Sequence, residues 1–553
     1  MKTKILKSII PAAALALTLN FSSCIGDLDV SPINPQQTME FDNDAVFNKI
    51  YASFSLTGQS GPNGNGDIDD VDEGRSGMFR SQWYLNEFTA DEAHWVWATD
   101  AGIPELLHNS WGESCVFSAA LYYRLYFTIT LCNFYLGQEG NAADQEIRNA
   151  EVRFIRAYNY ALVMDLYGNA AFTETVSAEM ALGYSRSQFF EYVERELKEC
   201  ADLMAEPGKN TYGRADRVAA WNLLARIYLN AEVYTGTPRW DDAMTYAEKV
   251  INNGYYHLNT TGATNPVTGE KYTGYQMLFL ADNNRNGAQY ENLLVGLTDG
   301  ETTKSYEGTN FLIQASYSNK VPTDNYAPSG ADNNWGKCIR LRKQLIDKFF
   351  TTKPAEAATL QNMITAANDD RVLFFNKGMD ISVSDEGTDE NLGYSCVKFR
   401  NVNSDGSNNA VIEFVNTDLP VMRIAEAYLT YAEASVRKNG AIGNSDAKAK
   451  IDELRTRAHA PVKSTYTLDD ICDEWSREFW LEGRRRVDLI RFGKFAGQSS
   501  YKWEWMGGVY EGNQFPSYMS IFPLPVNEIS NNKNLKQNTG CLLYTSPSPR
   551  DTR

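Results

Sequence analysis

Residues 150–168 read AEVRFIRAYNYALVMDLYG, and apolar side chains recur in this stretch with the period of an α-helix. Phe154, Ala157 and Tyr158 stand at positions i, i+3 and i+4, which share one face of a helix. Gly168 follows the last apolar turn, where glycine readily takes the left-handed conformation that ends a helix. The stretch therefore predicts a long helix with one buried face.

The same periodicity recurs in pairs of neighbouring segments. Residues 214–236 and 241–254 form one pair, and residues 420–440 and 447–460 form a second pair, each with a short break between its members. Small alanines stand where the paired helices would cross. Such helical hairpins are typical of tetratricopeptide-like (TPR-like) units, so we expect a mainly α fold.

Between the helical segments the chain is rich in Asn, Gly, Thr, Asp and Tyr, which predicts long loops and a few short strands. ENLLVGL and NAVIEFV are the expected strands. We therefore expect one domain over 24–540 with a helical frame at about 42–254 and 416–495. The loop-rich insertions, at about 56–110 and 255–415, are expected to carry the function.

Both ends of the chain have their own signatures. MKTKILKSIIPAAALALTLNFSSC combines lysines with an apolar run too short to span a bilayer, which is typical of a secretory signal over 1–23. Cys24 then predicts the acylated first residue of a membrane-anchored lipoprotein, the alternative being an ordinary secreted protein with a chance cysteine. Residues 541–553 carry no periodic pattern and are interpreted as a non-native tail, or else as a genuine disordered one.

Charge and composition exclude some ligands. The formal net charge of −18 argues against nucleic acid, which needs a basic face. The arginine run at 483–486 lies near Glu478 and Glu482, so internal ion pairing is a better interpretation than phosphate binding. Aromatic residues make up 12% of the chain, which suggests aromatic surface as well as aromatic core.

Metal and thiol chemistry receive little support. The four histidines are isolated, and none has the spacing of a catalytic zinc site. A structural calcium ion near Asp282 and Asn284 is the one metal that we consider, and no cofactor is expected. The cysteines after Cys24 are scattered, so buried free thiols are expected for most of them, although one or two disulfides stay open.

Residues 91–100 read DEAHWVWATD and place two tryptophans one residue apart. Side chains one apart point to opposite sides of an extended chain. Trp95 is therefore interpreted as a core residue. Trp97 is interpreted as an exposed platform for an apolar ligand face.

Three long segments carry a family resemblance. RFIRAYNYALVMDLYGNAAF, EFWLEGRRRVDLIRFGKF (478–495) and IFPLPVNEISNNKNLKQNTG together resemble the SusD family of outer-membrane glycan-binding lipoproteins. The resemblance extends from Cys24 to Gly540. CIGDLDVSP, with acids directly after the cysteine, also resembles the export tag of lipoproteins displayed on the cell surface.

This resemblance implies four TPR-like units, no catalysed reaction, and a SusC-like TonB-dependent transporter in the outer membrane as the partner. The likeness is strongest to members that bind starch and malto-oligosaccharides, where aromatic rings cradle an α-1,4-glucan. The rings implied here are Trp97, Tyr306 and Trp335, and the implied partners of sugar hydroxyls are Asp72, Arg80 and Asp100. Asp100 departs from the family, which has an amide there, and a carboxylate accepts but does not donate hydrogen bonds.

Other interpretations stay open at this point. An exported helical-barrel glycoside hydrolase would need two carboxylates across a scissile bond, for which Asp72, Glu92 and Asp100 are the candidates. A family member that binds another glycan and a scaffold that binds only proteins are further alternatives. Asp72 and Arg80 could also simply pair with each other as a loop salt bridge.

Overall fold

The structure is a computed structural model that describes residues 41–62, 64–69, 72–318, 321, 326–332, 338–383, 389, 391–440 and 445–540. The chain divides into two compact units, 1–43 and 44–553, and the folded elements belong to the second unit apart from the first residue of the first helix. The predicted signal, Cys24, Trp335 and the tail 541–553 lie outside the described residues, so the interpretations that rest on them stay predictions.

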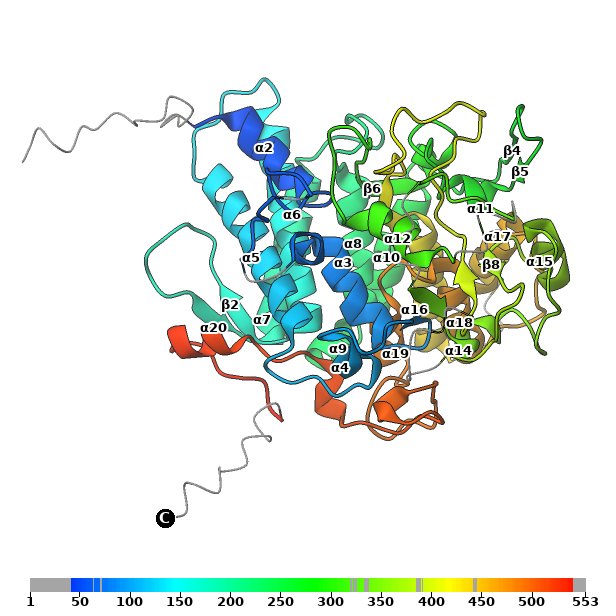
Figure 1. The fold of residues 1–553 in the computed structure, drawn as a ribbon. Coiled ribbons are helices and arrows are strands. Elements are labelled where there is room, and N and C mark those ends of the chain that lie inside the picture. The colour runs from blue at the N-terminus through cyan, green and yellow to red at the C-terminus, as the bar shows by residue number, and fades with distance from the viewer. Residues whose placement is uncertain are drawn as a thin grey trace, which may run out of the picture. The chain divides into compact units, whose positions relative to one another are not determined.

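The long helices form a row in which each helix packs on the next (Figure 1). In chain order the row consists of α5 (Val116–Leu136), α6 (Gln145–Leu166), α7 (Arg186–Ala201), α8 (Arg217–Leu229), α10 (Trp240–Ile251), α16 (Ala425–Asn439) and α17 (Ser445–Arg457). Because α10 packs on α16, the row continues across the intervening residues 255–415. The mainly α fold class, with helical hairpins as a frame, is thereby confirmed.

Both predicted hairpins are present, with one local difference. Residues 214–254 form α8 and α10 with the short α9 (Ala231–Thr235) between them. The start of the predicted helix 420–440 is wrong, because Leu419–Arg423 form strand β10, which pairs antiparallel with β6 (Asn292–Gly296). The partner strand lies far earlier in the chain, so local periodicity gives no sign of it.

Helix α6 is buried on nearly all sides along its last four turns, not on one face only. Its charged side chains are tolerated inside because they are paired. Glu151 binds Arg214 at 2.6 Å, and Arg156 binds Glu196 at 3.0 Å. The predicted helix end is confirmed, since Gly168 has a φ of +71° just beyond the last turn.

The inserted residues 255–415 contain short helices as well as loops and strands. The helices are α11 (Gly274–Met277), η3 (Ala288–Tyr290), α12 (Gly308–Ser316), α14 (Lys343–Ile346) and α15 (Leu360–Ala367). Besides β6 with β10, the antiparallel pairs are β1 (Ala93–Trp95) with β7 (Ile339–Leu341), β2 (Ala170–Phe172) with β3 (Leu182–Tyr184), β4 (Ala263–Thr264) with β5 (Lys271–Tyr272), and β8 (Phe374–Phe375) with β9 (Ser395–Cys396). ENLLVGL is confirmed as a strand, whereas NAVIEFV is not a strand, and its Phe414 packs against Tyr306.

Shorter elements before and after the row complete the second unit. They are α2 (Asn43–Ala52), η1 (Glu73–Ser76), α3 (Met78–Trp83), η2 (Tyr84–Phe88), α4 (Ile103–Leu107), α18 (Leu468–Phe479), α19 (Arg485–Arg491), η4 (Met506–Gly508), η5 (Ser517–Ser520) and α20 (Val526–Asn531). Helix α3 packs on α5, and α18 packs on both α16 and α19. These contacts attach α3 and α18 to the helical row.

The arginine run 483–486 is paired internally, as predicted. The pairs are Arg484 with Asp488 at 3.0 Å, Arg485 with Asp91 at 2.7 Å, and Arg486 with Asp165 at 3.2 Å. The run does not share one helix with Glu478, however. Leu481 and Gly483 have φ angles of +58° and +76°, so the chain turns between α18 and α19.

The cysteines in the described part of the chain are free and buried, which confirms the prediction for them. They are Cys115, Cys132, Cys200, Cys338, Cys396 and Cys472. Burial raises the pKa of the Cys132 thiol to about 12. A thiol with so high a pKa is unreactive at neutral pH.

Glu478 is the centre of a fully buried ion network. It binds Arg423 at 3.0 Å and Arg371 at 3.3 Å, and it also pairs with Arg457. Burial alone raises the pKa of Glu478, but the three arginines together lower it to about 2. The carboxylate is therefore charged at every physiological pH and is matched by its neighbours.

Replacing Glu478 by Ala is expected to lower the free energy of unfolding by roughly 3–5 kcal/mol, because it leaves buried guanidinium groups without their partner. Urea denaturation followed by circular dichroism measures this loss. Glu199→Ala is the matched control, since Glu199 binds Arg153 at 2.6 Å with a side chain that is 52% exposed. A loss from Glu478→Ala no larger than that of the control would contradict the central role of Glu478.

Candidate functional site

Trp95 belongs to a buried aromatic cluster, defined here as Tyr84, Phe88, Trp95 and Phe311. Trp95 is 3% exposed, and its ring centroid lies 5.5–6.5 Å from those of the other three. Trp97 is half-buried, and its indole stands at 85° to that of Trp95. The prediction that Trp95 is a core residue is confirmed. The glycan-binding role of Trp97 stays a prediction.

Asp100 braces the loop that carries Trp97. Its Oδ2 accepts a hydrogen bond from the indole nitrogen Nε1 of Trp95 at 3.0 Å. Its backbone N–H donates to the Trp97 carbonyl, also at 3.0 Å, and closes a turn. Asp100 thus holds Trp95 and Trp97 in a fixed relation, and its carboxylate is half-exposed.

Arg80 of α3 is buried and connects the aromatic cluster to the loop that carries Tyr306. Its Nε donates to the Tyr84 hydroxyl at 2.9 Å, and its Nη1 donates to the Tyr306 carbonyl at 3.0 Å. Its guanidinium lies 4.7 Å from the ring centroid of Phe311, in cation–π range. With only 4% of its surface exposed, Arg80 fixes the position of Tyr306.

Gly74 lets these residues approach each other. A Cβ at this position would lie 2.6 Å from the Tyr306 Cβ and 2.8 Å from Nη1 of Arg80. Both distances are shorter than a van der Waals contact permits, so only glycine fits here. The Tyr306 ring is half-buried, and its centroid lies 5.6 Å from that of Phe414.

Glu307 caps the start of α3. Its carboxylate accepts hydrogen bonds from the backbone N–H groups of Phe79 at 2.7 Å and Arg80 at 3.1 Å. These N–H groups have no partner inside the helix, and the helix dipole favours negative charge there. Burial nevertheless dominates, and it raises the pKa of Glu307 to about 7.

Four of the six residues predicted to touch a glycan lie around the aromatic cluster. Trp97 and Asp100 contact it through Trp95. Arg80 contacts it directly and holds Tyr306 in place. The structure thus joins residues from two distant parts of the sequence into one supported site.

The other two residues predicted to touch a glycan are Asp72 and Trp335. Asp72 is exposed at the start of η1, within the loop that leads to α3. Trp335 lies outside the described residues, three positions before Cys338. The Cys338 carbonyl accepts a hydrogen bond from the Val96 N–H at 2.8 Å, next to Trp97 in the chain.

Sequence reasoning missed the residues that support this site. Tyr84 and Phe311 look like ordinary core aromatics in the sequence, and Glu307 differs from many exposed acids only by following Tyr306 directly. Their roles depend on contacts between α3 and α12, which are far apart in the chain. No local pattern signals such contacts.

Comparisons with known proteins identify the family of this chain. The SusD family model matches residues 339–540, and a model described as starch-binding, associating with outer membrane, matches residues 28–229. The starch-binding protein SusD of Bacteroides thetaiotaomicron is 38% identical, over 98% of this chain and 100% of its own length. The chain belongs to the SusD family.

Solved structures of SusD-like proteins share the fold. A SusD-like protein of Bacteroides fragilis has a TM-score of 0.65 at 17% identity, covering 92% of this chain and 100% of its own. Surface glycan-binding protein A of Bacteroides thetaiotaomicron, solved with laminarihexaose, has a TM-score of 0.62 at 19% identity, covering 90% and 98%. The curated relative is a SusD-type binding protein and not an enzyme, and this chain shares the fold of the solved SusD-like structures.

One of the three carboxylates considered for a hydrolase is buried in the interior of this SusD-family fold. Glu92 is 1% exposed and accepts hydrogen bonds from the Leu481 N–H at 3.1 Å and from the Ser476 hydroxyl. Asp100 is bound to Trp95. Glu92 therefore supports the interior, and the hydrolase interpretation loses one of its three candidates.

The carboxylate proposed for a calcium ion is occupied by hydrogen bonds. Asp282 Oδ2 accepts from the N–H and the hydroxyl of Ser404, and Oδ1 accepts from the Asn286 amide at 3.0 Å. Within the described part of this SusD-family chain, no group of three or more His, Cys, Asp or Glu side chains could hold a metal ion.

None of the described helices is long and apolar enough to cross a membrane.

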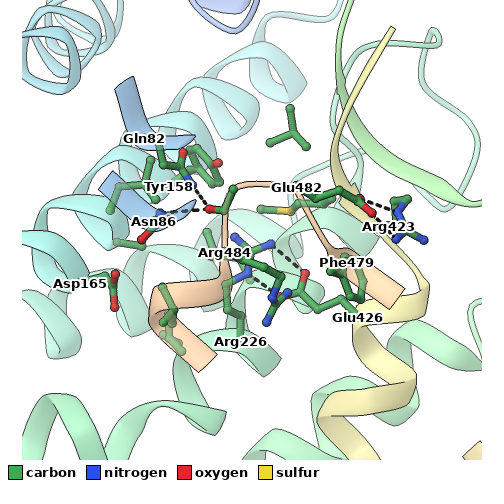
Figure 2. Close-up of a pocket in the computed structure, with 18 of the residues that line it drawn as sticks. Gln82, Asn86, Tyr158, Asp165, Arg226, Arg423, Glu426, Phe479, Glu482 and Arg484 are labelled. Atoms are coloured by element: carbon green, nitrogen blue, oxygen red, sulfur yellow. Dashed lines mark hydrogen bonds and ion pairs between the residues drawn. The ribbon is translucent and has the colours of Figure 1, made fainter. Parts of the chain in front are cut away.

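An interior pocket of about 80 Å³ lies between α6, α8, α16 and the turn before α19 (Figure 2). None of the six predicted glycan-binding residues lines it. Glu426 binds Arg226 at 2.6 Å and Arg484 at 3.1 Å, and the Gly483 carbonyl accepts from the Asn86 amide at 3.0 Å. The polar groups that line the pocket are thus engaged with one another, and its volume suits a few water molecules, not a sugar chain.

The raised pKa of Glu307 predicts a specific pH dependence of stability. The pKa of the Glu307 carboxyl is 4.5 in the unfolded chain and about 7 in the folded one. The contribution of the protonated carboxyl to the free energy of unfolding is therefore complete below about pH 4 and is lost as the pH rises to about 7. Between pH 5 and 8 the wild type should lose roughly 1–3 kcal/mol more unfolding free energy than Glu307→Gln, which cannot ionise.

Urea denaturation of both proteins at the two pH values measures this difference. Glu199→Gln, at a largely exposed site, controls for a general effect of removing one charge. The same pH dependence in wild type and Glu307→Gln would show that Glu307 is ionised throughout this range.

Proposed function

We propose that this protein captures starch and malto-oligosaccharides at the cell surface, as an outer-membrane lipoprotein anchored through Cys24. The observation that supports this most is the 38% identity to a starch-binding protein over nearly the whole chain. The placement of Trp97 and Tyr306 adds to it, because both rings are partly exposed and stand on a rigid, buried support.

Sugar rings and aromatic rings fit each other physically. A pyranose ring has an apolar C–H face, and stacking an indole or phenol on it contributes about 1–2 kcal/mol through buried area. Trp97, Tyr306 and Trp335 would supply three such platforms. Since association itself is costly, we expect an affinity of roughly 0.1–1 mM for short oligosaccharides.

Polar groups would then fix the orientation of the sugar. Asp72 and Asp100 are the exposed and half-exposed carboxylates of the site, and they accept hydrogen bonds from hydroxyls. The family resemblance implies that Arg80 also contacts a sugar hydroxyl. Because Arg80 is buried, its main contribution is to hold Tyr306 through the main-chain carbonyl.

The captured glycan would pass to a SusC-like TonB-dependent transporter. A weak binding site suits this role, because a ligand that is held loosely is released quickly to the next site. Many lipid-anchored copies on one surface raise the local concentration of sites and compensate for the weak individual affinity. Family membership supports the proposal of this partner.

A second candidate is a related protein that prefers another glucan. Surface glycan-binding protein A, which shares the fold at 19% identity, was solved with laminarihexaose. Asp100 also stands where the starch-binding members of the family carry an amide, and it lacks the amide donor. The preferred linkage is therefore the part of the proposal that an oligosaccharide array of α- and β-glucans tests directly.

Trp97→Ala should abolish the retardation of the protein in native gels that contain starch, because it removes one stacking platform. Its melting temperature should stay within a few degrees of wild type, since Trp97 is half-buried. Trp221→Ala is the matched control at another half-buried tryptophan. Undiminished retardation of Trp97→Ala would refute the proposed site. A large fall in its melting temperature would show that Trp97 is a core residue.

Asp100→Asn should leave stability nearly unchanged, because an amide oxygen can still accept the Trp95 indole N–H. The new N–H donor should change the affinity for maltoheptaose roughly 2–10-fold, which is the worth of one hydrogen bond. Isothermal titration calorimetry measures this change. Identical affinities of wild type and variant would mean that Asp100 does not face the sugar.

A further inference from the structure

We infer that a second pocket, lined in part by β6, binds a single pyranose ring independently of Trp97. This pocket, called the Tyr255 pocket, has a volume of about 110 Å³. It is lined by the 208–214 loop between α7 and α8, by Tyr255 and Tyr256 after α10, by Asn284 and Gln289, and by β6. None of the six residues of the proposed starch site lines it.

Tyr255 offers a stacking platform at this pocket. A Cβ added to Gly208 would lie 2.4–2.5 Å from Cγ, Cδ1 and Cδ2 of the Tyr255 ring, so the glycine backbone lies against the face of that ring. Gly208 also has a φ of +66°, which favours glycine. The Tyr255 side chain is nevertheless 41% exposed, so a large part of the ring is available to a ligand.

Neighbouring rings hold Tyr255 in this orientation. Tyr256 stands at 87° to it with centroids 5.0 Å apart, and Tyr290 stands at 67° to it with centroids 5.5 Å apart. The Tyr256 hydroxyl is fixed in turn, since it donates to Asp216 at 2.8 Å. A ring held in advance loses little freedom on binding, which favours affinity.

Asn292 supplies a buried amide with spare hydrogen-bonding capacity inside the pocket. It is 4% exposed, and its side chain interacts with the Tyr212 hydroxyl, but neither Oδ1 nor Nδ2 makes a hydrogen bond of ordinary geometry to the described residues. The Tyr212 hydroxyl itself donates to Asp418 at 3.1 Å. A buried amide whose hydrogen bonds are not all made is unfavourable, so a ligand with both donors and acceptors would complete this site.

Arg214, the charged side chain in the lining, is already paired. It binds Glu151 at 2.6 Å and Asp144 at 2.9 Å. Asp216 lies outside the lining, and its carboxylate accepts hydrogen bonds from the Gly208 N–H at 2.7 Å and from Tyr256. The site therefore favours a neutral polyhydroxyl compound over an ion.

An aromatic platform beside amide groups is the chemistry that recognises a sugar ring. With a volume of about 110 Å³ the pocket holds several water molecules, so no more than one sugar ring would enter it. The choice of a glycan as ligand rests on the proposed function, whereas the place of the site rests on the pocket itself. One ring of an oligosaccharide would enter, and the rest would extend past Tyr255.

Saturation-transfer NMR on the full chain tests this inference, with glucose, maltotriose and laminaritriose as the probes. The background is Trp97→Ala, which removes the proposed starch site. In that background at least one sugar should still show transfer, and adding Tyr255→Ala should lower the signal at least 5-fold. Tyr510→Ala is the matched control, because the Tyr510 side chain is 42% exposed and does not line the pocket.

Asn292→Leu is a second variant that tests the amide. It removes a buried amide that makes no hydrogen bond of ordinary geometry, so the melting temperature should stay near that of wild type while the sugar signal is lost. The inference is overturned if no sugar shows transfer in Trp97→Ala, or if Tyr255→Ala and Asn292→Leu leave the signal unchanged. Failure of the starch proposal has a different signature, namely undiminished retardation of Trp97→Ala in starch gels.

Discussion

The buried ion network around Glu478 is the constraint on which the rest of the fold depends. Its arginines come from different parts of the chain, Arg371 from the inserted loops, Arg423 from β10 and Arg457 from the end of α17. A buried charge is tolerated only when its partners are all in place. The frame and the insertion therefore have to assemble together, because neither can bury its own charges alone.

The turn that follows this network positions the proposed glycan site. Leu481, with a φ of +58°, accepts a hydrogen bond at its carbonyl from the Trp83 indole at 3.0 Å and donates its N–H to Glu92 at 3.1 Å. Trp83 lies on α3, which carries Arg80, and Glu92 directly precedes β1. One strained turn thus fixes both elements that lead to the proposed sugar platforms. Rigid support of this kind lets weakly binding surface rings keep a defined geometry.

How far the sequence predicts the structure depends on the range of the interactions. Helix periodicity and the alternation of Trp95 with Trp97 are local, and the structure agrees with both. The strand at Leu419–Arg423 depends on its pairing with β6, and the burial of Arg80 depends on a carbonyl of Tyr306. Family resemblance points to Arg80 as a site residue, but only the fold shows that its guanidinium is turned inward.

Asp100 has one structural requirement to meet, and the proposed binding role is separate from it. The interior requires one hydrogen-bond acceptor at this position, for the indole of Trp95. Aspartate and asparagine both meet that requirement with one oxygen, and they differ in the other atom, which accepts in one case and donates in the other. The core therefore requires an acceptor at Oδ2 and places no such requirement on the other terminal atom, which the proposed function assigns to the sugar. Under the proposed function, an exchange of acid for amide at this position would therefore alter the contact with the sugar and leave the bond to Trp95 in place.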